Sequence, residues 1–519
     1  MLTGDFLRTA ARRHPDRVAV AQGPQRISYA QLDADADRFA NALLQRGLGK
    51  GTRIAVIAPN IPEYAVVYFG AARAGCVSAH LSIRATPADT CLMLDRIGAQ
   101  LVLFDSGSAA AVLAQLARNP QIRHAVVMDS DNIATLPEAS IEIITLQQML
   151  AAASAHPPEA AIAPDDPLAI TFTGGTTGTP KAVVVSHAAR YASARTATTQ
   201  FGLTEQDVMG VATPLFHAAG LFVCFAPAIL LGATTVLLKT WSTGKFIEMI
   251  ERERVTATFM VPTQLGDLIS HPEFSTARVA SLRNISYAGA PMPPNLFARV
   301  REVLPHVQFT ENYGQSETGP ITVRRAADAA DKFSTVGRRV NDTDVQVLKT
   351  DGSLAAAGEI GEIVTRGSHV FSGYFGDPEQ TAQAFSAGNW LRTGDTGYFD
   401  QDGFLVLVDR IKDIIICGGE NIYPAEIENA LFRHPAVAEC AAFGIPDDRS
   451  GELPAAHVVL AAGERVSDSE LIEFCATQIA RHKRPRVIRF VASLPRTPVG
   501  KIQRNVVRAE YWQGRARSI

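Results

Sequence analysis

Short apolar runs alternate with longer amphipathic segments through the first half of the chain. Apolar runs of strand length lie at 53–58 and 101–104, and a segment of helical length lies between them at 63–75. This alternation continues to about residue 309. Strands separated by helices are typical of parallel sheets whose two faces are covered by helices. We therefore expect a large α/β domain.

After Thr335 the pattern changes to alternating strands joined by tight turns. Alternation at 345–348 and 359–364 is interrupted by Asp351-Gly352, and Asp402-Gly403 marks a second turn. Aspartate-glycine pairs favour two-residue hairpins because both positions of such a turn need a positive φ. The sequence therefore predicts a β-rich subdomain that closes the large domain.

From Tyr423 onward helices and strands are mixed. The pattern predicts two helices and three strands in a compact α+β domain of about a hundred residues, at 425–433, 436–444, 455–460, 467–481 and 487–491.

One uncharged stretch, 218–238, is long enough to span a membrane. Gly220, Pro227 and Gly232 interrupt it. We interpret this stretch as a buried helix, a turn and a buried strand.

Composition and charge exclude several classes of protein. The 519 residues are 47% hydrophobic, and 49 basic and 52 acidic residues give a net charge of −3. This balance provides no general attraction for nucleic acid or anionic membranes. The six cysteines form no CxxC pair, and no signal peptide is visible, so we expect reduced cysteines and a cytoplasmic location.

A glycine- and threonine-rich loop lies between two apolar strands at 168–172 and 182–185. Glycines let backbone N–H groups face a ligand, threonine hydroxyls add donors, and Lys181 supplies a positive charge, so the loop is suited to bind phosphate. It is not a Walker A loop, because Pro180 precedes the lysine and Ala182 follows it.

Five further motifs follow this loop: YGQSET at 313–318, TGD at 393–395, DRIKD at 409–413, GGEN at 418–421 and PVGKIQR at 498–504. In this order, the six motifs resemble the adenylate-forming superfamily of acyl-CoA synthetases, amino-acid adenylation domains and luciferases. The resemblance covers the chain from about residue 10 to residue 508. Within this superfamily, the sequence most resembles the fatty-acid and aryl-acid CoA ligases, including the chlorobenzoate type.

The resemblance implies the domain organisation and the reaction. An N-terminal adenylation domain, 1–410, would be followed by a mobile C-terminal domain, 411–519, with a hinge at 410–413 that pivots at Lys412. The enzyme would use ATP and Mg²⁺ to convert a carboxylic acid into acyl-AMP and pyrophosphate, and would then form acyl-CoA and AMP from coenzyme A. Two alternatives stay open: transfer of the acyl group to a separate carrier protein, and nucleotide binding by an inactive regulatory scaffold. Retention of Lys501, Glu317 and Asp395 argues against the second.

The chemistry requires cations and N–H donors where charge develops on the phosphate. By resemblance, Lys501 bridges the carboxylate and phosphate oxygens, Glu317 holds Mg²⁺, and His217 lies beside the reacting carboxylate. The other residues matched to nucleotide or CoA are Thr173, Gly174, Gly175, Thr176, Thr177, Gly178 and Lys181 for phosphate, Gly289, Ala290, Pro291 and Tyr313 for adenine, Ser316 for the α-phosphate, Asp395 and Arg410 for ribose, and Gly418, Gly419 and Glu420 for the CoA step.

Two positions depart from the family pattern: Gly174 replaces the usual serine, and Ala182 replaces a common glycine. We expect weaker or slower handling of ATP at most. A basic turn at 481–486 could contact the CoA phosphates or could simply be solvated.

The predicted acid pocket is small and mostly apolar. Amino-acid-activating relatives have an aspartate at position 218, whereas this chain has Ala218, so a substrate ammonium would lie buried without a partner. We therefore expect a medium-length or aromatic acid and no free amino acid. The matched lining residues are Ala218, Ala219, Phe222, Ala288, Asn312, Pro320 and Ile321. Asn312 would favour a polar group on the acid. No sequence feature fixes the oligomeric state, and a homodimer is kept as the working expectation.

Overall fold

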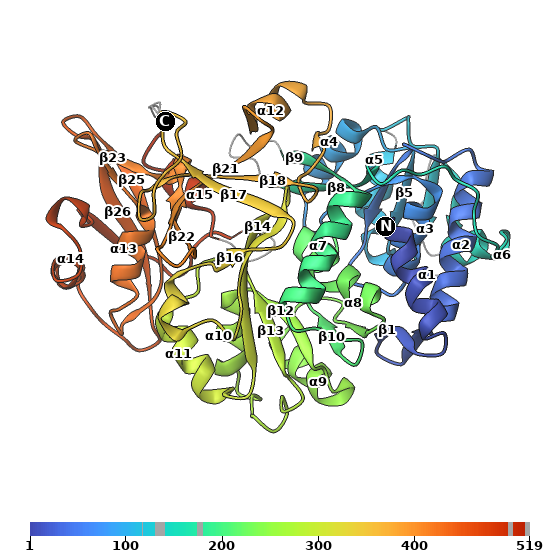
Figure 1. The fold of residues 1–519 in the computed structure, drawn as a ribbon, viewed down its shortest axis with the longest axis horizontal. Helices are drawn as coiled ribbons and strands as arrows, with labels where there is room; N and C mark the ends of the chain where they lie inside the picture. The colour runs from blue at the N-terminus through green and yellow to red at the C-terminus, as the bar shows by residue number, and fades with distance from the viewer. Residues whose placement is uncertain (117, 130–140, 174–179, 497–501, 514–519) are drawn as a thin grey trace.

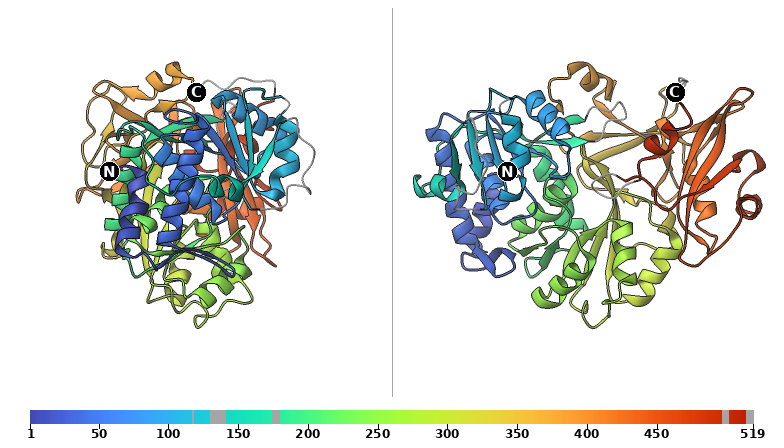
Figure 2. Two further views of the ribbon diagram at one scale, coloured as in Figure 1. Left: turned by 90° about the vertical axis from the view of Figure 1, so that its right-hand side faces the viewer. Right: turned by 180° about the vertical axis from the view of Figure 1, so that it is seen from behind.

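The computed structural model describes residues 1–116, 118–129, 141–173, 180–496 and 502–513. Its strands form four sheets, and the C-terminal domain lies at one end of an elongated molecule, opposite the first helices (Figure 1; Figure 2, right). The first sheet has the order β19 (Gly373–Tyr374), β9 (Lys181–Ser186), β8 (Pro167–Thr173), β4 (Val77–His80), β3 (Arg53–Ile57), β5 (Leu101–Phe104), β6 (His124–Val127), β7 (Ile143–Thr145).

The second sheet passes through the middle of the molecule. Its order is β16 (Arg338–Arg339), β15 (Gly319–Arg324), β14 (Gln308–Gln315), β13 (Asn284–Tyr287), β12 (Ala257–Met260), β10 (Val208–Val211), β11 (Thr234–Leu237), β1 (Val18–Gln22), β2 (Gln25–Ser28). Strands β10 to β14 pair in parallel, as do β3, β4, β5 and β8. The predicted α/β domain with parallel sheets is therefore confirmed.

Helices cover these two sheets. They are α1 (Thr3–Arg13), α2 (Tyr29–Gln45), α3 (Glu63–Ala74), α4 (Pro87–Ile97), η1 (Ser106–Ser108), α5 (Ala109–Leu116), α6 (Leu146–Ala151), α7 (His187–Gln200), η3 (Ala219–Phe225), α8 (Ala226–Leu231), α9 (Thr243–Glu253), α10 (Pro262–Ser270), α11 (Pro294–Val303) and η4 (Ala330–Ser334). Local chemistry sets their ends: the Ser28 hydroxyl accepts from Gln31 N at the start of α2, and Gly75 ends α3 with φ of 75°.

The apolar stretch at 218–238 forms η3, α8 and β11, with Gly232 at φ of 85° between the helix and the strand. The interpretation as a buried helix, a turn and a strand is confirmed. None of the described helices is long and apolar enough to cross a membrane. The six cysteines are unpaired, but Cys91 and Cys417 are partly exposed.

The third sheet is the predicted β-rich subdomain. It contains β17 (Thr343–Leu348), β18 (Gly361–Gly367), β21 (Trp390–Phe399) and β20 (Phe385–Ser386), with β22 (Leu405–Arg410) paired to β21, and α12 (Pro378–Gln383) lies beside it. Gly352 and Gly403 have φ of 82° and 77° in the predicted turns, but Asp351 and Asp402 do not have a positive φ, so these are not the two-residue turns that the sequence favoured.

The fourth sheet is the centre of the C-terminal domain. It contains β24 (Glu420–Ile422), β23 (Ile415–Cys417), β26 (Gly451–Leu460) and β25 (Val437–Asp447), with β27 (Val487–Phe490) paired to β26. The helices here are η5 (Ile411–Asp413), α13 (Pro424–Leu431), α14 (Asp468–Ala476), η6 (Arg481–Lys483) and α15 (Arg504–Ala509). The chain crosses from the third sheet to the fourth at 410–415, where the hinge is predicted.

Candidate active site

The hairpin of β14 and β15 holds the centre of the candidate site. A side chain at Gly314 would overlap the carbonyl oxygen of Gly319, and Gly319 has φ of 65°. Both positions therefore require glycine, the first for close approach and the second for a left-handed backbone. The turn between them carries Ser316 and Glu317, so Tyr313 and Glu317 lie close together along the chain at one end of the hairpin.

Asp395 is buried and held by several donors. The Tyr313 hydroxyl donates to Asp395 Oδ2 at 2.7 Å, Gln315 Nε2 donates to the same oxygen at 2.8 Å, and Arg410 Nε lies 3.5 Å from Oδ1. The register of β21 and β22 pairs Asp395 with Arg410 directly. Burial, and secondly the neighbouring Asp395, raise the pKa of Tyr313 well above its usual value. The structure thus brings Tyr313, Asp395 and Arg410 together, as predicted, and adds Gln315.

Glu317 and Lys181 meet at Tyr374. The Tyr374 hydroxyl donates to Glu317 Oε1 at 3.0 Å, and Lys181 Nζ lies 4.8 Å from the centre of the Tyr374 ring. Strand β19 positions this tyrosine by pairing it with Val183 of β9. Burial raises the pKa of Glu317, opposed by its hydrogen bonds and by Lys181 and Arg410. The carboxylate and the lysine therefore share one wall of the site.

The predicted phosphate loop lies between antiparallel strands, where Thr173 of β8 pairs with Lys181 of β9. This hairpin differs from the strand-to-helix geometry of a Walker A loop. Gly174, Gly175, Thr176, Thr177, Gly178 and the predicted catalytic Lys501 lie outside the described residues.

The predicted acid pocket draws on residues at and before η3, in β14 and β15, and after β13. Helix η3 and the residues before it contribute His217, whose Nδ1 accepts from Ala219 N at 3.2 Å, together with Ala218 and the buried Phe222. Asn312 is buried, and its Nδ2 donates to the Tyr287 carbonyl at 3.3 Å. The remaining predicted lining and adenine residues follow β13 or lie in β15: Ala288, Gly289, Ala290 and Pro291, then Pro320 and Ile321.

The C-terminal domain places Gly418 and Gly419 in the tight turn between β23 and β24, with φ of 61° and 85°. Glu420 follows the turn, and its Oε2 lies 3.2 Å from His482 Nε2 of the basic turn 481–486. The turn predicted for the CoA step and the basic turn, for which contact with CoA stayed open, are therefore neighbours.

The hinge segment is tied to the C-terminal domain. Arg504 Nη2 lies 2.6 Å from Glu428 Oε2, and Arg504 Nη1 lies 3.9 Å from Asp409 and 3.7 Å from Asp413. The Lys412 carbonyl accepts from Arg508 at 3.4 Å. Burial raises the pKa of Asp409 to about 6, opposed by Arg504.

Among the described residues, no group of three or more histidine, cysteine, aspartate or glutamate side chains could hold a metal ion. Glu317 supplies a carboxylate on the same wall as Lys181, and a single carboxylate suits Mg²⁺ that is bound mainly through phosphate and water. Sequence reasoning missed Tyr374, which belongs to no motif, and the role of Gln315, which lies inside one.

The chain is similar to known proteins along most of its length. The family model for AMP-binding enzymes matches residues 7–375, and the model for their C-terminal domain matches residues 426–501. Feruloyl-CoA synthase of Amycolatopsis sp is 35% identical over 502 residues, which cover 96% of this chain and 97% of that protein. Long-chain-fatty-acid–CoA ligase FadD13 of Mycobacterium tuberculosis is 34% identical over 487 residues, covering 94% and 93%. The solved structure of ATP-bound MatB from Rhodopseudomonas palustris is 27% identical and covers 98% of this chain and 99% of its own, with a TM-score of 0.87.

Proposed function

Because the chain belongs to the family of AMP-binding enzymes, we propose that its site residues carry out the two half-reactions of an acid:CoA ligase. The protein is an AMP-forming acid–thiol ligase. It activates a carboxylic acid with ATP as acyl-AMP, releases pyrophosphate, and transfers the acyl group to coenzyme A.

The observation that carries the assignment is the grouping of Tyr313, Asp395 and Arg410 beside the hairpin that also carries Glu317. The Asp395 carboxylate is fixed by Tyr313 and Gln315, so its oxygens are oriented to accept from the ribose hydroxyls of ATP. Arg410 lies on the same side and balances this charge. The ring of Tyr313 is held in place and offers a flat surface beside the adenine.

Phosphate binding is assigned to the loop 173–181 and to the Glu317 wall. Lys181 and the loop donors would bind the phosphates, and Glu317 would hold Mg²⁺, which offsets phosphate charge when bound. The hydrogen bond from Tyr374 fixes one Glu317 oxygen, and the other oxygen would be the ligand of the ion.

The C-terminal domain serves both half-reactions in turn. Lys501 stabilises the charge that develops during adenylation. After rotation about Lys412, the turn at Gly418 and Gly419 and the adjoining basic turn would border the CoA path. A medium-length or aromatic acid, a cytoplasmic location and a homodimer stay predictions.

Replacing Lys501 by alanine tests this assignment. Lys501→Ala should lower pyrophosphate release by roughly 100- to 1000-fold, as expected for loss of one charge-stabilising donor. Conversion of chemically supplied acyl-AMP with CoA should persist, because that step uses another face of the domain. Lys349→Ala, which removes an exposed lysine that belongs to none of the site motifs, is the control.

Equal loss of both half-reactions in Lys501→Ala would contradict the assignment. Carrier-protein transfer is the second candidate function, since the first half-reaction is identical. Release of AMP and formation of a thioester with free CoA exclude it. Absence of pyrophosphate release with every acid tested would exclude both the CoA ligase and the carrier-protein function.

A further inference from the structure

Arg190 is a buried arginine near the start of α7. Its side chain is only 2% exposed, and it is among the largest fully buried side chains in the described part of the chain. Helix α7 packs against η3, α8 and β15, and α7 and α8 are labelled side by side in Figure 1. An arginine at this depth normally requires a carboxylate or several hydrogen bonds, because its charge cannot be removed near neutral pH.

Two of the three guanidinium nitrogens of Arg190, Nε and Nη2, are buried without a hydrogen-bond partner in the described protein. The other two buried arginines of the described chain differ: Arg73 pairs with Asp33 and Asp37, and Arg324 pairs with Glu311. Arg190 therefore stands apart from the other buried guanidinium groups.

The guanidinium lies between two walls of the predicted acid pocket. Its central carbon is 4.9 Å from the centre of the Phe222 ring. Its Nη1 is 3.8 Å from the position that a Cβ on Gly319 would take, next to Pro320. Phe222 and Pro320 were both assigned to the acid pocket from the sequence. Arg190 thus borders the predicted pocket, although it belongs to none of the sequence motifs.

The groups around Arg190 do not neutralise it. Tyr68 and Glu317 interact with it electrostatically, and burial lowers its pKa to about 10, so it stays protonated at neutral pH. The Glu317 carboxylate already accepts from Tyr374 and forms no ion pair with Arg190 within the described contacts. A ligand atom can therefore supply the acceptor that the described protein does not.

We propose that Arg190 determines substrate specificity by binding a second hydrogen-bond acceptor, preferentially a carboxylate, at the end of the acid remote from the activated carboxylate. This inference rests on the proposed function. The guanidinium lies beside Phe222 of η3 and Gly319 of β15, so the acceptor would lie where these two elements border the predicted acid pocket. A compact dicarboxylic acid therefore fits better than a purely apolar acid of the same size.

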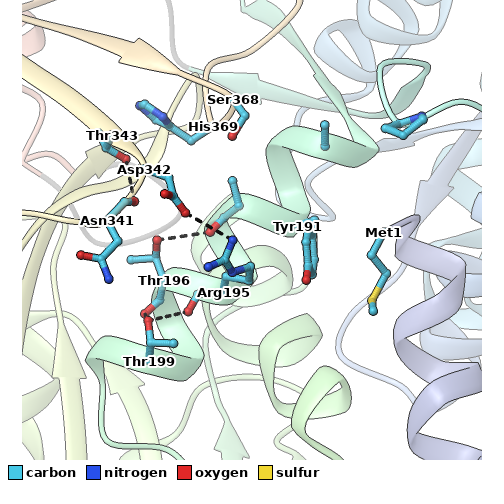
Figure 3. A pocket seen from close by; sticks show the side chains of 13 residues that line it. Met1, Tyr191, Arg195, Thr196, Thr199, Asn341, Asp342, Thr343, Ser368 and His369 are labelled. Atoms are coloured by element: carbon cyan, nitrogen blue, oxygen red, sulfur yellow. Dashed lines mark hydrogen bonds and ion pairs between the residues drawn. The ribbon is translucent and has the colours of Figure 1, made fainter.

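A second arginine on the same helix offers a matched control. Arg195 lines a different pocket of about 250 Å³, together with Tyr191, Thr196 and Asp342 (Figure 3). Arg195 Nη1 lies 3.2 Å from Asp342 Oδ2, and both side chains are more than half exposed. Arg190 does not line that pocket.

The test compares acids of similar shape by pyrophosphate release. Terephthalate is paired with 4-methylbenzoate, and adipate with hexanoate, for the parent, Arg190→Met, Arg190→Lys and Arg195→Met. The parent should prefer the diacid in at least one pair. Arg190→Met should lower the kcat/KM ratio of diacid to monoacid by roughly 10- to 100-fold, the size expected for a hydrogen bond to a charged group. Arg190→Lys should keep part of the preference, and Arg195→Met should keep all of it.

A second measurement does not depend on turnover. Terephthalate should raise the Tm of the parent and of Arg195→Met, but not that of Arg190→Met. If the parent activates both monoacids and neither diacid, or if the ratio is unchanged in a folded Arg190→Met, the inference is overturned and the proposed function stands. If no acid releases pyrophosphate, the proposed function fails, and the Tm shift alone decides whether Arg190 binds the second carboxylate.

Discussion

The two ends of strand β15 each lie beside a buried arginine, but the arginines are satisfied differently. At the far end, Arg324 Nη2 donates to Glu311 Oε2 at 2.7 Å and to the Tyr287 hydroxyl, and its Nε donates to the Thr335 carbonyl at 3.2 Å. At the near end, Arg190 lies beside Gly319 and has no carboxylate partner among the described residues. The protein therefore supplies the hydrogen-bond acceptors of Arg324, whereas it leaves donors of Arg190 without acceptors.

This difference separates a structural charge from one that is available to a ligand. Arg324 and Glu311 neutralise each other where β14 enters the site, immediately before Asn312 and Tyr313. Removing either of these charges should lower the stability of the fold. Arg190 contributes an uncompensated charge, and its removal should change the preference for the acid substrate.

The largest expected effect is on stability. Arg324→Met leaves the Glu311 carboxylate buried without its cation, which costs about 3 to 5 kcal/mol for a broken buried ion pair. Arg190→Met should instead leave stability unchanged or raise it, because it removes an uncompensated buried charge. Urea denaturation of parent and variants, followed by fluorescence, measures both.

The double variant Arg324→Met/Glu311→Gln is the control. Removing both charges should recover much of the lost stability, because a neutral pair is often as stable as the buried ion pair. Equal destabilisation by Arg324→Met and Arg190→Met would contradict the distinction between the two ends of β15.

The sequence could predict the elements but not every partnership between them. Asp395 and Arg410 both belong to motifs. The turn predicted at Asp402-Gly403 lies midway between them, which explains why the register of β21 and β22 pairs them. Tyr374 was missed because its contact with Lys181 arises from the pairing of β19 with β9, two segments far apart in the chain. No local pattern encodes such a pairing.

Arg190 was missed for a different reason. Helix α7 buries a polar face that includes His187, Arg190 and Ser193, so its apolar periodicity does not distinguish the buried side from the exposed side. Sequence reasoning places an arginine in such a helix on the surface. Only the packing of α7 on η3 and β15 reveals that this one lies inside.

A methyl group at Gly319 gives the next largest effect. Alanine there would adopt a left-handed φ of 65° and would overlap the Ser193 hydroxyl beside Arg190. Gly352→Ala is the control, since Gly352 has φ of 82° with nothing within 4 Å of an added Cβ. Both substitutions should lower the free energy of unfolding by about 1 to 2 kcal/mol, because alanine is strained in a left-handed backbone. Gly319→Ala should lower it by about 1 to 3 kcal/mol more, because of overpacking.

Gly319→Ala should also lower kcat/KM for the acid, because it narrows the space between β15 and α7. Chemical denaturation and pyrophosphate release separate the two consequences. If Gly319→Ala and Gly352→Ala behave alike in both assays, the near end of β15 is not tightly packed around Arg190.

The smallest expected effect is a change in the titration of His369. This side chain is 3% exposed, its Nε2 lies 3.0 Å from the Thr365 hydroxyl, and its pKa is lowered to about 4 by burial first and by the charge of Arg190 second. Because the folded pKa lies below the ordinary value of 6.5, the unfolded state takes up the proton first. The stability that neutral His369 contributes is therefore present above pH 6.5 and is lost as the pH falls toward about 4.

Arg190→Met should raise the pKa of His369, so the loss of stability over this range should be shallower than in the parent. The change is small because burial, the larger cause, is retained, and the other buried histidines cancel in the comparison. NMR of selectively labelled histidine measures the pKa, with Arg195→Met as the control. An unchanged pKa in Arg190→Met would mean that the guanidinium charge does not reach His369 and is neutralised within the fold, as the charge of Arg324 is.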